Sequence, residues 1–216
     1  EKRAAREIQL RKAGERITQN AALPLGALTN QIAEMACDIL GAPCAVVYPY
    51  YEEFGVYDVH SIGAYGLTHP KETTIRAKPR GETGGTANFI LTQQNRLVVD
   101  DVRRGWSREN TLEILPRVNK FLTRENVQAF VGLRLQIDQE PVGALFVNFR
   151  EPHYFTSAEL DAIQIFASQA AVAIHQARLL MRGEKEQRAN DIMSRITQMI
   201  GVKTSPRQIL EDLLRG

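Results

Sequence analysis

Residues 130–160 read FVGLRLQIDQEPVGALFVNFREPHYFTSAEL, and this stretch holds two strands and the start of a helix. In its first run, apolar residues at positions 131, 133, 135 and 137 alternate with Gly132, Arg134 and Gln136. The second run, VGALFVNF, follows a short turn at residues 138–140. Two adjacent alternating runs joined by a short turn predict a β-hairpin, and Pro152 ends its second strand.

A capping box marks the helix that follows the hairpin. Thr156 can cap the first turn while Glu159 reaches back to it, and Phe155 can pack on Leu160 as a hydrophobic staple. The helix then carries an apolar stripe whose members are spaced alternately by three and four residues, as in a coiled-coil seam. The stripe consists of Leu160, Ile163, Ala167, Ala170, Ile174, Ala177 and Met181.

Alanine at three positions of this seam lets another helix approach closely. We therefore predict that residues 157–182, roughly 40 Å at ~1.5 Å per residue, both pack on the sheet and pair with a second copy of the chain. The expected assembly is a parallel homodimer, a coiled coil on residues 160–181 helped by the apolar face of residues 25–39.

Similar patterns place the other elements. An amphipathic helix is predicted over residues 25–39, and Gly41 and Pro43 end it. The runs CAVVYPYY (44–51), VYDVHSIGAYG (56–66) and RLVVDDV (96–102) predict strands. The segment GETGGTANFILTQQN (81–95) predicts a glycine-rich turn and a short helix, and another helix is expected around residues 111–121.

Composition limits the function classes. The chain has 216 residues, of which 44% are apolar, and its net charge of +2 excludes a strongly basic nucleic-acid binder. Cys37 and Cys44 give neither a disulfide framework nor zinc-ligand spacing, which favours a reduced, cytoplasmic setting. No secretory signal opens the chain, and residues 162–177, the longest stretch without a charge, are too short for a membrane span. A start without Met and an end in mid-pattern suggest a piece of a longer protein.

The order of these pieces resembles a GAF domain, a sensory relative of the PAS fold. The hairpin and the helix start at Phe155–Leu160 resemble the end of the family pattern. The stretch GETGGTANFILTQQNRLVVDDV resembles the centre of that pattern, and DILGAPCAVVYPYY resembles its first helix-to-strand junction. The resemblance implies an α+β fold with a central antiparallel sheet of about six strands and long N- and C-terminal helices on one face. Residues 65–130 would cover the other face. The expected division is a signalling helix or linker (1–24), the GAF domain (25–182), and a linker helix with the start of a following domain (183–216).

The same resemblance implies a function. It predicts a non-enzymatic sensory module that binds an unknown small molecule and signals through dimeric flanking helices. The output domain would lie in the same chain, as in the sensor histidine kinases of two-component systems. A ligand-free module for dimerisation and relay is the alternative. The sequence identifies no cofactor and no metal cluster, and no cysteine follows Cys44 to hold a bilin covalently.

Five residues are candidates for the ligand site. Arg134 should point away from the helix-facing row of its strand, and an internal salt bridge is the alternative to a bound acid. Phe89, Trp106 and Phe121 are plausible pocket walls and equally plausible core residues. His60, expected within a strand, is the weakest candidate, since a lone histidine is usually structural. The pair Asp100–Asp101 is expected to cap a turn rather than perform acid–base chemistry.

Overall fold

The computed structural model describes residues 14, 16–17, 20, 22–70, 85–92, 94–104 and 120–203. Their framework is a six-stranded antiparallel sheet with the order β2–β1–β6–β5–β4, and β3 also pairs with β1. The strands are β1 (Cys44–Tyr51), β2 (Val56–Tyr57), β3 (Gly63–Tyr65), β4 (Arg96–Val99), β5 (Ala129–Ile137) and β6 (Glu140–Phe149). The α+β class and the number of strands expected from the sequence are confirmed.

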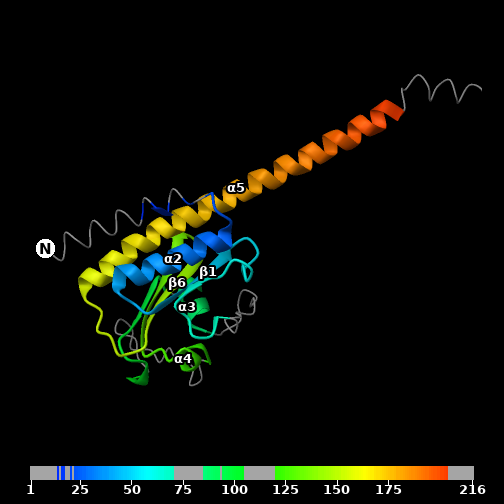
Figure 1. The fold of residues 1–216 in the computed structure, drawn as a ribbon. Coiled ribbons are helices and arrows are strands. Elements are labelled where there is room, and N and C mark those ends of the chain that lie inside the picture. Colours follow the sequence, from blue (N-terminus) through cyan, green and yellow to red (C-terminus); the bar gives the residue numbers. More distant parts are fainter. Residues whose placement is uncertain are drawn as a thin grey trace, which may run out of the picture. The chain divides into compact units, whose positions relative to one another are not determined.

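Helices cover both faces of the sheet. They are α2 (Leu25–Leu40), α3 (Thr86–Thr92), α4 (Lys120–Arg124) and α5 (Ser157–Lys203), with a 3-10 turn η2 at Val102–Arg104. Figure 1 shows α2 and the first part of α5 along one face, while α3 and α4 lie on the opposite side. None of the helices in the described part of the chain is long and apolar enough to cross a membrane.

The β5–β6 hairpin forms as predicted, with Asp138 in the left-handed region at φ 55°. Val131, Leu133 and Leu135 lie on the helix face of β5 and are fully buried. The intervening Gly132 lies on the opposite face, where a Cβ atom built on it would collide with the Ile90 side chain of α3. Each strand of the hairpin therefore has one row of side chains under the long helices and one row under α3.

The predicted capping box starts α5. The Thr156 N–H donates to Glu159 Oε2 at 2.8 Å, and the Glu159 N–H donates to Thr156 Oγ1 at 3.3 Å. A residue outside the helix adds a hydrogen bond, because Asp100 Oδ1 accepts the Phe155 N–H at 3.2 Å. Phe155 and Leu160, the predicted staple, are both buried. Local side chains thus fix the junction between β6 and α5.

The predicted dimer seam on α5 is wrong. From Leu160 to Ala177 its members are at most 7% exposed within a single chain, and only Met181 is partly exposed. A side chain that is already buried in its own core has no surface left for a second copy. The helix also continues past residue 182 to Lys203, and residues Arg178–Gly216 form a second compact unit.

The burial of Ala170 predicts that Ala170→Glu unfolds the domain instead of separating two subunits. An unpaired carboxylate in an apolar core is costly, and we expect a loss above about 4 kcal/mol. Urea denaturation followed by circular dichroism measures it. Ala158→Glu, at an exposed position of the same helix, is the matched control and should change stability by less than about 0.5 kcal/mol. A wild-type transition in Ala170→Glu would contradict this packing.

Candidate functional site

Five aromatic side chains gather on the face of the sheet that α3 and α4 cover. We call Tyr48, Tyr50, Tyr57, Phe130 and Phe146 the aromatic cluster. The Tyr48 ring centroid lies 6.2 Å from that of Tyr57 and 5.9 Å from that of Phe146, both edge to face. Tyr50 and Tyr57 meet in the same way at 5.4 Å. These are favourable ring geometries, and each of the five residues is less than a tenth exposed.

Strand register sets what lies beside this cluster. Tyr48 on β1 pairs with Ala144 on β6, and Ala144 pairs with Arg134 on β5. Because these strands pair directly, the three side chains stand in one row on one face of the sheet. Arg134 therefore points toward the side of α3, as the alternation predicted.

Arg134 holds α3 against the sheet. Its Nε donates to the Ile90 carbonyl oxygen at 3.0 Å, near the end of α3, where helix carbonyls lack intrahelical partners. Burial lowers the pKa of the Arg134 guanidinium, and the Glu52 carboxylate acts in the opposite direction. Among the described residues, its hydrogen-bond partner is a backbone carbonyl, whereas the sequence left an internal salt bridge open.

The other sequence-predicted candidates divide into three groups. Phe89 on α3 and Phe121 on α4 are partly buried and pack against the buried core that contains the aromatic cluster, so both lie at this face. Trp106 lies outside the described residues. The expected strand at residues 56–66 is wrong at its centre, because a turn separates β2 from β3. His60 lies in that turn with an exposed side chain, and its N–H donates to Asp58 Oδ1 at 3.2 Å.

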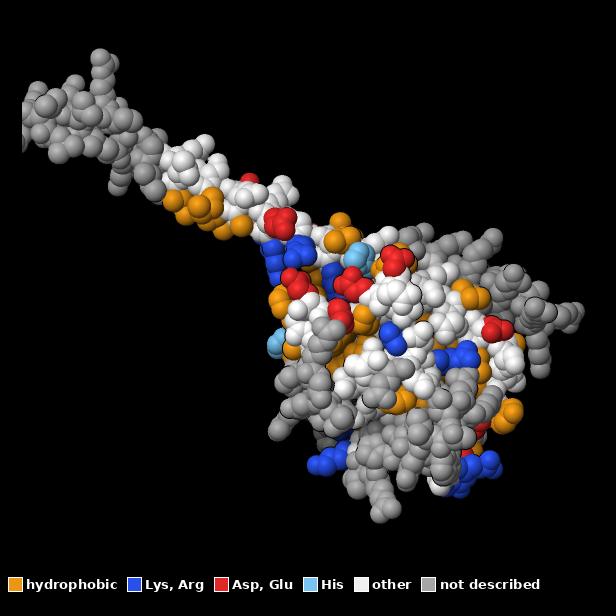
Figure 2. Space-filling view, turned by 180° about the vertical axis from the view of Figure 1, so that it is seen from behind, with side chains coloured by type: hydrophobic (Ala, Val, Ile, Leu, Met, Phe, Trp, Pro, Cys, Tyr) orange, Lys and Arg blue, Asp and Glu red, His pale blue; other side chains and the backbone are white. Residues whose placement is uncertain are grey.

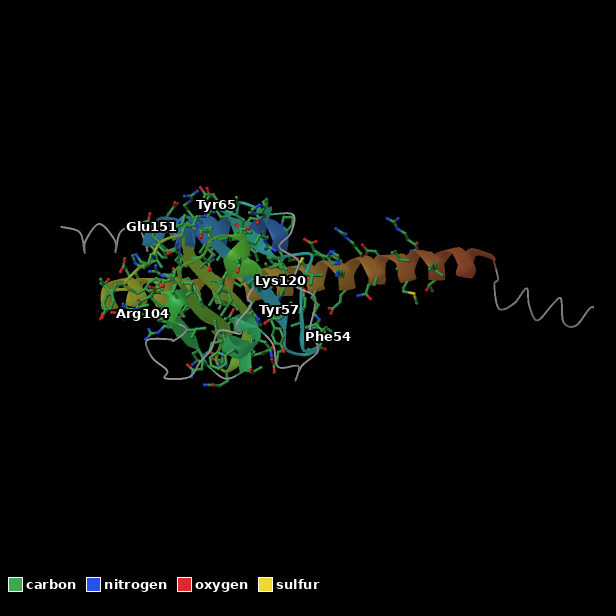
Figure 3. The ribbon with its side chains drawn as sticks, turned by 90° about the horizontal axis from the view of Figure 1, so that it is seen from below. Phe54, Tyr57, Tyr65, Arg104, Lys120 and Glu151 are labelled. Carbon is green, nitrogen blue, oxygen red and sulfur yellow. The ribbon has the colours of Figure 1, made fainter. Side chains whose placement is uncertain are left out.

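Tyr57 has a polar group that the sequence did not single out. Its side chain is buried, and its hydroxyl has no hydrogen-bond partner among the described residues. Burial raises the pKa of Tyr57, and the neighbouring Tyr50 and Tyr48 add to this, so the phenol keeps its proton. Figure 3 labels Tyr57 in a view from the side of α3 and α4. A protonated hydroxyl without a partner can donate to an incoming acceptor.

Glu125, at the end of α4, has many partners instead. Its carboxylate is fully buried and accepts the backbone N–H groups of Thr68 at 2.6 Å and His69 at 3.0 Å. Arg124 Nε lies 3.6 Å and Arg150 Nη2 4.0 Å from its oxygens. Burial alone would raise the pKa of Glu125, but these hydrogen bonds and Arg124 lower it below its ordinary value. Glu125 thereby fastens the segment after β3 to the end of α4.

The paired aspartates and the cysteines are structural. Asp101 accepts Arg103 Nε at 2.8 Å and Nη2 at 2.7 Å, and the hydrogen bond from Arg103 holds the pKa of Asp101 at about 2. Cys37 and Cys44 are both buried, as expected for small core residues, and burial raises their pKa values to about 12 and about 11. Within the described residues, no group of three or more His, Cys, Asp or Glu side chains could hold a metal ion.

A six-stranded antiparallel sheet, with long helices on one face and short helices over an aromatic cluster on the other, defines the class of GAF-like α+β domains. The family model of the GAF domain matches residues 24–174, and the chain belongs to this family. Members of the family are typically non-catalytic sensory modules. A comparison with curated proteins finds no match.

Solved GAF structures share the fold at low identity. The GAF domain of a phosphoenolpyruvate-protein phosphotransferase from Coxiella burnetii gives a TM-score of 0.61 at 18% identity, covering 81% of this chain and 98% of that one. Free methionine-R-sulfoxide reductase from Neisseria meningitidis, in complex with its substrate, gives 0.60 at 12%, covering 83% and 94%. The phycoerythrobilin-bound GAF domain of a cyanobacterial phytochrome gives 0.56 at 22%, covering 82% and 97%. At these identities the likeness shows the fold alone.

The Glu125 network predicts that Glu125→Gln destabilises the domain. The Arg124 and Arg150 side chains are 20% and 34% exposed and can be solvated, so the main loss is the charged acceptor of the Thr68 and His69 N–H groups, at a cost of ~1–3 kcal/mol. Chemical denaturation near neutral pH measures the change. Glu151→Gln removes a carboxylate from an exposed position and is the matched control, which should be nearly silent.

The same carboxylate predicts a pH dependence. Because folding lowers the pKa of Glu125, its stabilising contribution is present above the unfolded value of about 4 and is lost as the pH falls through the folded value. The difference in unfolding free energy between wild type and Glu125→Gln should therefore shrink in strong acid. A difference that stays constant from neutral pH down to about pH 3 would contradict the assignment.

Proposed function

We propose that this chain is a non-enzymatic sensory GAF domain that binds a small molecule at the aromatic cluster. The observation that carries the proposal is the pairing of a buried aromatic surface with a partly buried guanidinium and a phenol that has no partner among the described residues. Small-molecule sites typically combine an apolar, aromatic lining with a few convergent polar groups. Phe89 and Phe121 belong to the proposed lining, because both pack on the buried core that contains the aromatic cluster. Trp106 remains a candidate from the sequence.

Signal transmission follows from the strands that the two faces share. The Arg134–Ile90 hydrogen bond ties α3 to β5, and the alternate residues of the same strand, including Leu133, face the long helices. A ligand that binds more tightly when α3 has shifted would favour a different packing of the hairpin under α2 and α5. It can act only through that difference in affinity.

We further propose that the domain acts as a homodimer through an exposed stripe of α5. Ile165 is 52% and Val172 47% exposed, and the seven-residue spacing between them continues in the sequence at Leu179. Figure 2 shows apolar side chains on the surface of the later part of α5 as well. Apolar residues that recur every seven positions on a solvent-facing side favour helix pairing. An output domain further along the same chain, such as a histidine kinase, would receive the signal.

Ligand binding predicts a ligand-dependent melting temperature. The protein should be purified under native conditions, examined by native mass spectrometry, and screened against a metabolite library by thermal shift. A ligand at a hundred times its Kd stabilises the folded state by ~2.7 kcal/mol. Tyr57→Phe should weaken the shift, whereas Tyr154→Phe, at a 76% exposed tyrosine, should leave it unchanged. No bound mass and no shift with any compound would favour the ligand-free relay module.

The exposed stripe predicts that Val172→Glu yields monomers. A carboxylate at the centre of a helix pair must be desolvated, while in a single chain it remains in water. Multi-angle light scattering measures the mass, and circular dichroism checks that the fold persists. Gln176→Glu, one turn away on the exposed surface, is the control for added charge. A dimer that survives both Val172→Glu and Ile165→Glu would remove α5 from the interface.

A further inference from the structure

We propose that the aromatic cluster binds a small organic acid that has its carboxylate on Arg134, its apolar body against Tyr48, and a second acceptor at the Tyr57 hydroxyl. The inference rests on the proposed function and specifies the chemical class of the ligand. Three independent features of the described residues support it: an unpartnered buried donor, an oriented cation, and the row of side chains between them.

The buried donor is the Tyr57 hydroxyl. Tyr57 is 5% exposed, and its hydroxyl has no partner among the described residues. Leaving a buried polar group unsatisfied costs ~1–3 kcal/mol. Its two ring neighbours, Tyr48 and Tyr50, hold it in edge-to-face contacts. The phenol is thus fixed in position and can donate a hydrogen bond to an acceptor that the described part of the protein does not provide.

The oriented cation is Arg134. The Arg134 Nε donates to the Ile90 carbonyl oxygen, and the terminal nitrogens of the guanidinium have no partner among the described residues. Glu52 acts on it electrostatically, but no carboxylate of the described part lies within ion-pair distance of Arg134. A guanidinium keeps its charge in proteins and only donates hydrogen bonds. With Nε held, its remaining donors are pre-organised for a carboxylate, which accepts two parallel hydrogen bonds.

The separation between Tyr48 and Arg134, which stand in one row of side chains across three strands, limits the length of the ligand. The two residues stand two strands apart, about 10 Å between backbones, and the small residue Ala144 stands between them in the row. A single ring or a short chain spans that separation. Ala144 is itself fully buried, and α3 lies over β5 and β6. Binding therefore requires α3 to move, and this couples the ligand to the conformational change that a sensor needs.

The charge balance favours a carboxylate over a phosphate. The Arg134 guanidinium compensates one negative charge. Arg124 also acts electrostatically on Tyr48, but it lies beside the Glu125 carboxylate, so a dianion would leave excess negative charge beside five aromatic rings. The donors at both ends also exclude a cationic or purely donating ligand, since Arg134 brings no acceptor. The chemical class is therefore a monocarboxylate with an apolar body and a hydrogen-bond acceptor at the far end.

The test uses 4-acetylbenzoate, benzoate, 4-acetylbenzamide and inorganic phosphate as probes, with affinities measured by isothermal titration calorimetry on the whole chain. Wild type should bind 4-acetylbenzoate at least about tenfold more tightly than the amide, a difference of 1.4 kcal/mol, and phosphate more weakly still. Tyr57→Phe should weaken 4-acetylbenzoate about fivefold, the value of one hydrogen bond, and leave benzoate unchanged. Arg134→Gln should abolish the preference for acid over amide.

Stability measurements separate binding from folding. Tyr57→Phe should leave the melting temperature of the free protein unchanged or raise it, because the hydroxyl has no hydrogen-bond partner in the described part of the chain. Arg134→Lys keeps the charge and should retain part of the acid preference if Arg134→Gln proves unstable. Tyr154→Phe, at an exposed tyrosine, controls for loss of a phenol.

Any one of several results would overturn the inference. They are equal affinity for acid and amide, no binding of the acid up to about 10 mM, or a melting temperature that drops in Tyr57→Phe. A neutral or phosphorylated molecule found on the native protein would also overturn it, and would leave the proposed sensory function standing. If no probe binds and native mass spectrometry finds no bound molecule, both this inference and the proposed ligand-binding function are wrong.

Discussion

The two-residue period of the β5–β6 hairpin is the constraint on which the rest of the structure depends. Leu133 and Leu135 face the long helices and are fully buried, while Phe130 and Arg134 lie on the side of α3. A register shift of one residue would exchange the two rows and place a guanidinium under α2 and α5. The helix core and the candidate site are therefore fixed by the same alternation, and neither can change without the other.

Two buried polar residues illustrate how structural and functional roles can be separated. Glu125 carries a charge and is compensated by two backbone N–H groups and by nearby arginines, so its network holds the fold. Tyr57 carries only a hydroxyl, and that hydroxyl lacks a partner within the described residues. Native structures leave few buried polar groups unsatisfied. The contrast therefore assigns Glu125 to stability and makes Tyr57 the better indicator of a ligand.

Local patterns predicted much of the fold. Short stretches of sequence predicted the hairpin, the Thr156–Glu159 capping box and α2, because the interactions that form them join residues close in sequence. The dimer seam failed because a three–four spacing shows which side of a helix is apolar and does not show whether its own sheet or another chain covers it. The Glu125 network was missed because Thr68 lies 57 residues away in sequence. Arg134 was placed on the correct face, yet its carbonyl partner on α3 depended on tertiary packing.

Amide hydrogen exchange, followed by mass spectrometry on the native protein with its ligand retained or removed, tests most directly whether the aromatic cluster is the sensory site. We predict that ligand removal changes the amide exchange rates most in α3 and in the strands that carry Tyr48, Tyr57 and Phe146. Smaller changes should follow in α2 and α5 through the shared hairpin. Exchange changes confined to α2 and α5, with α3 and β2 unaffected, would contradict it.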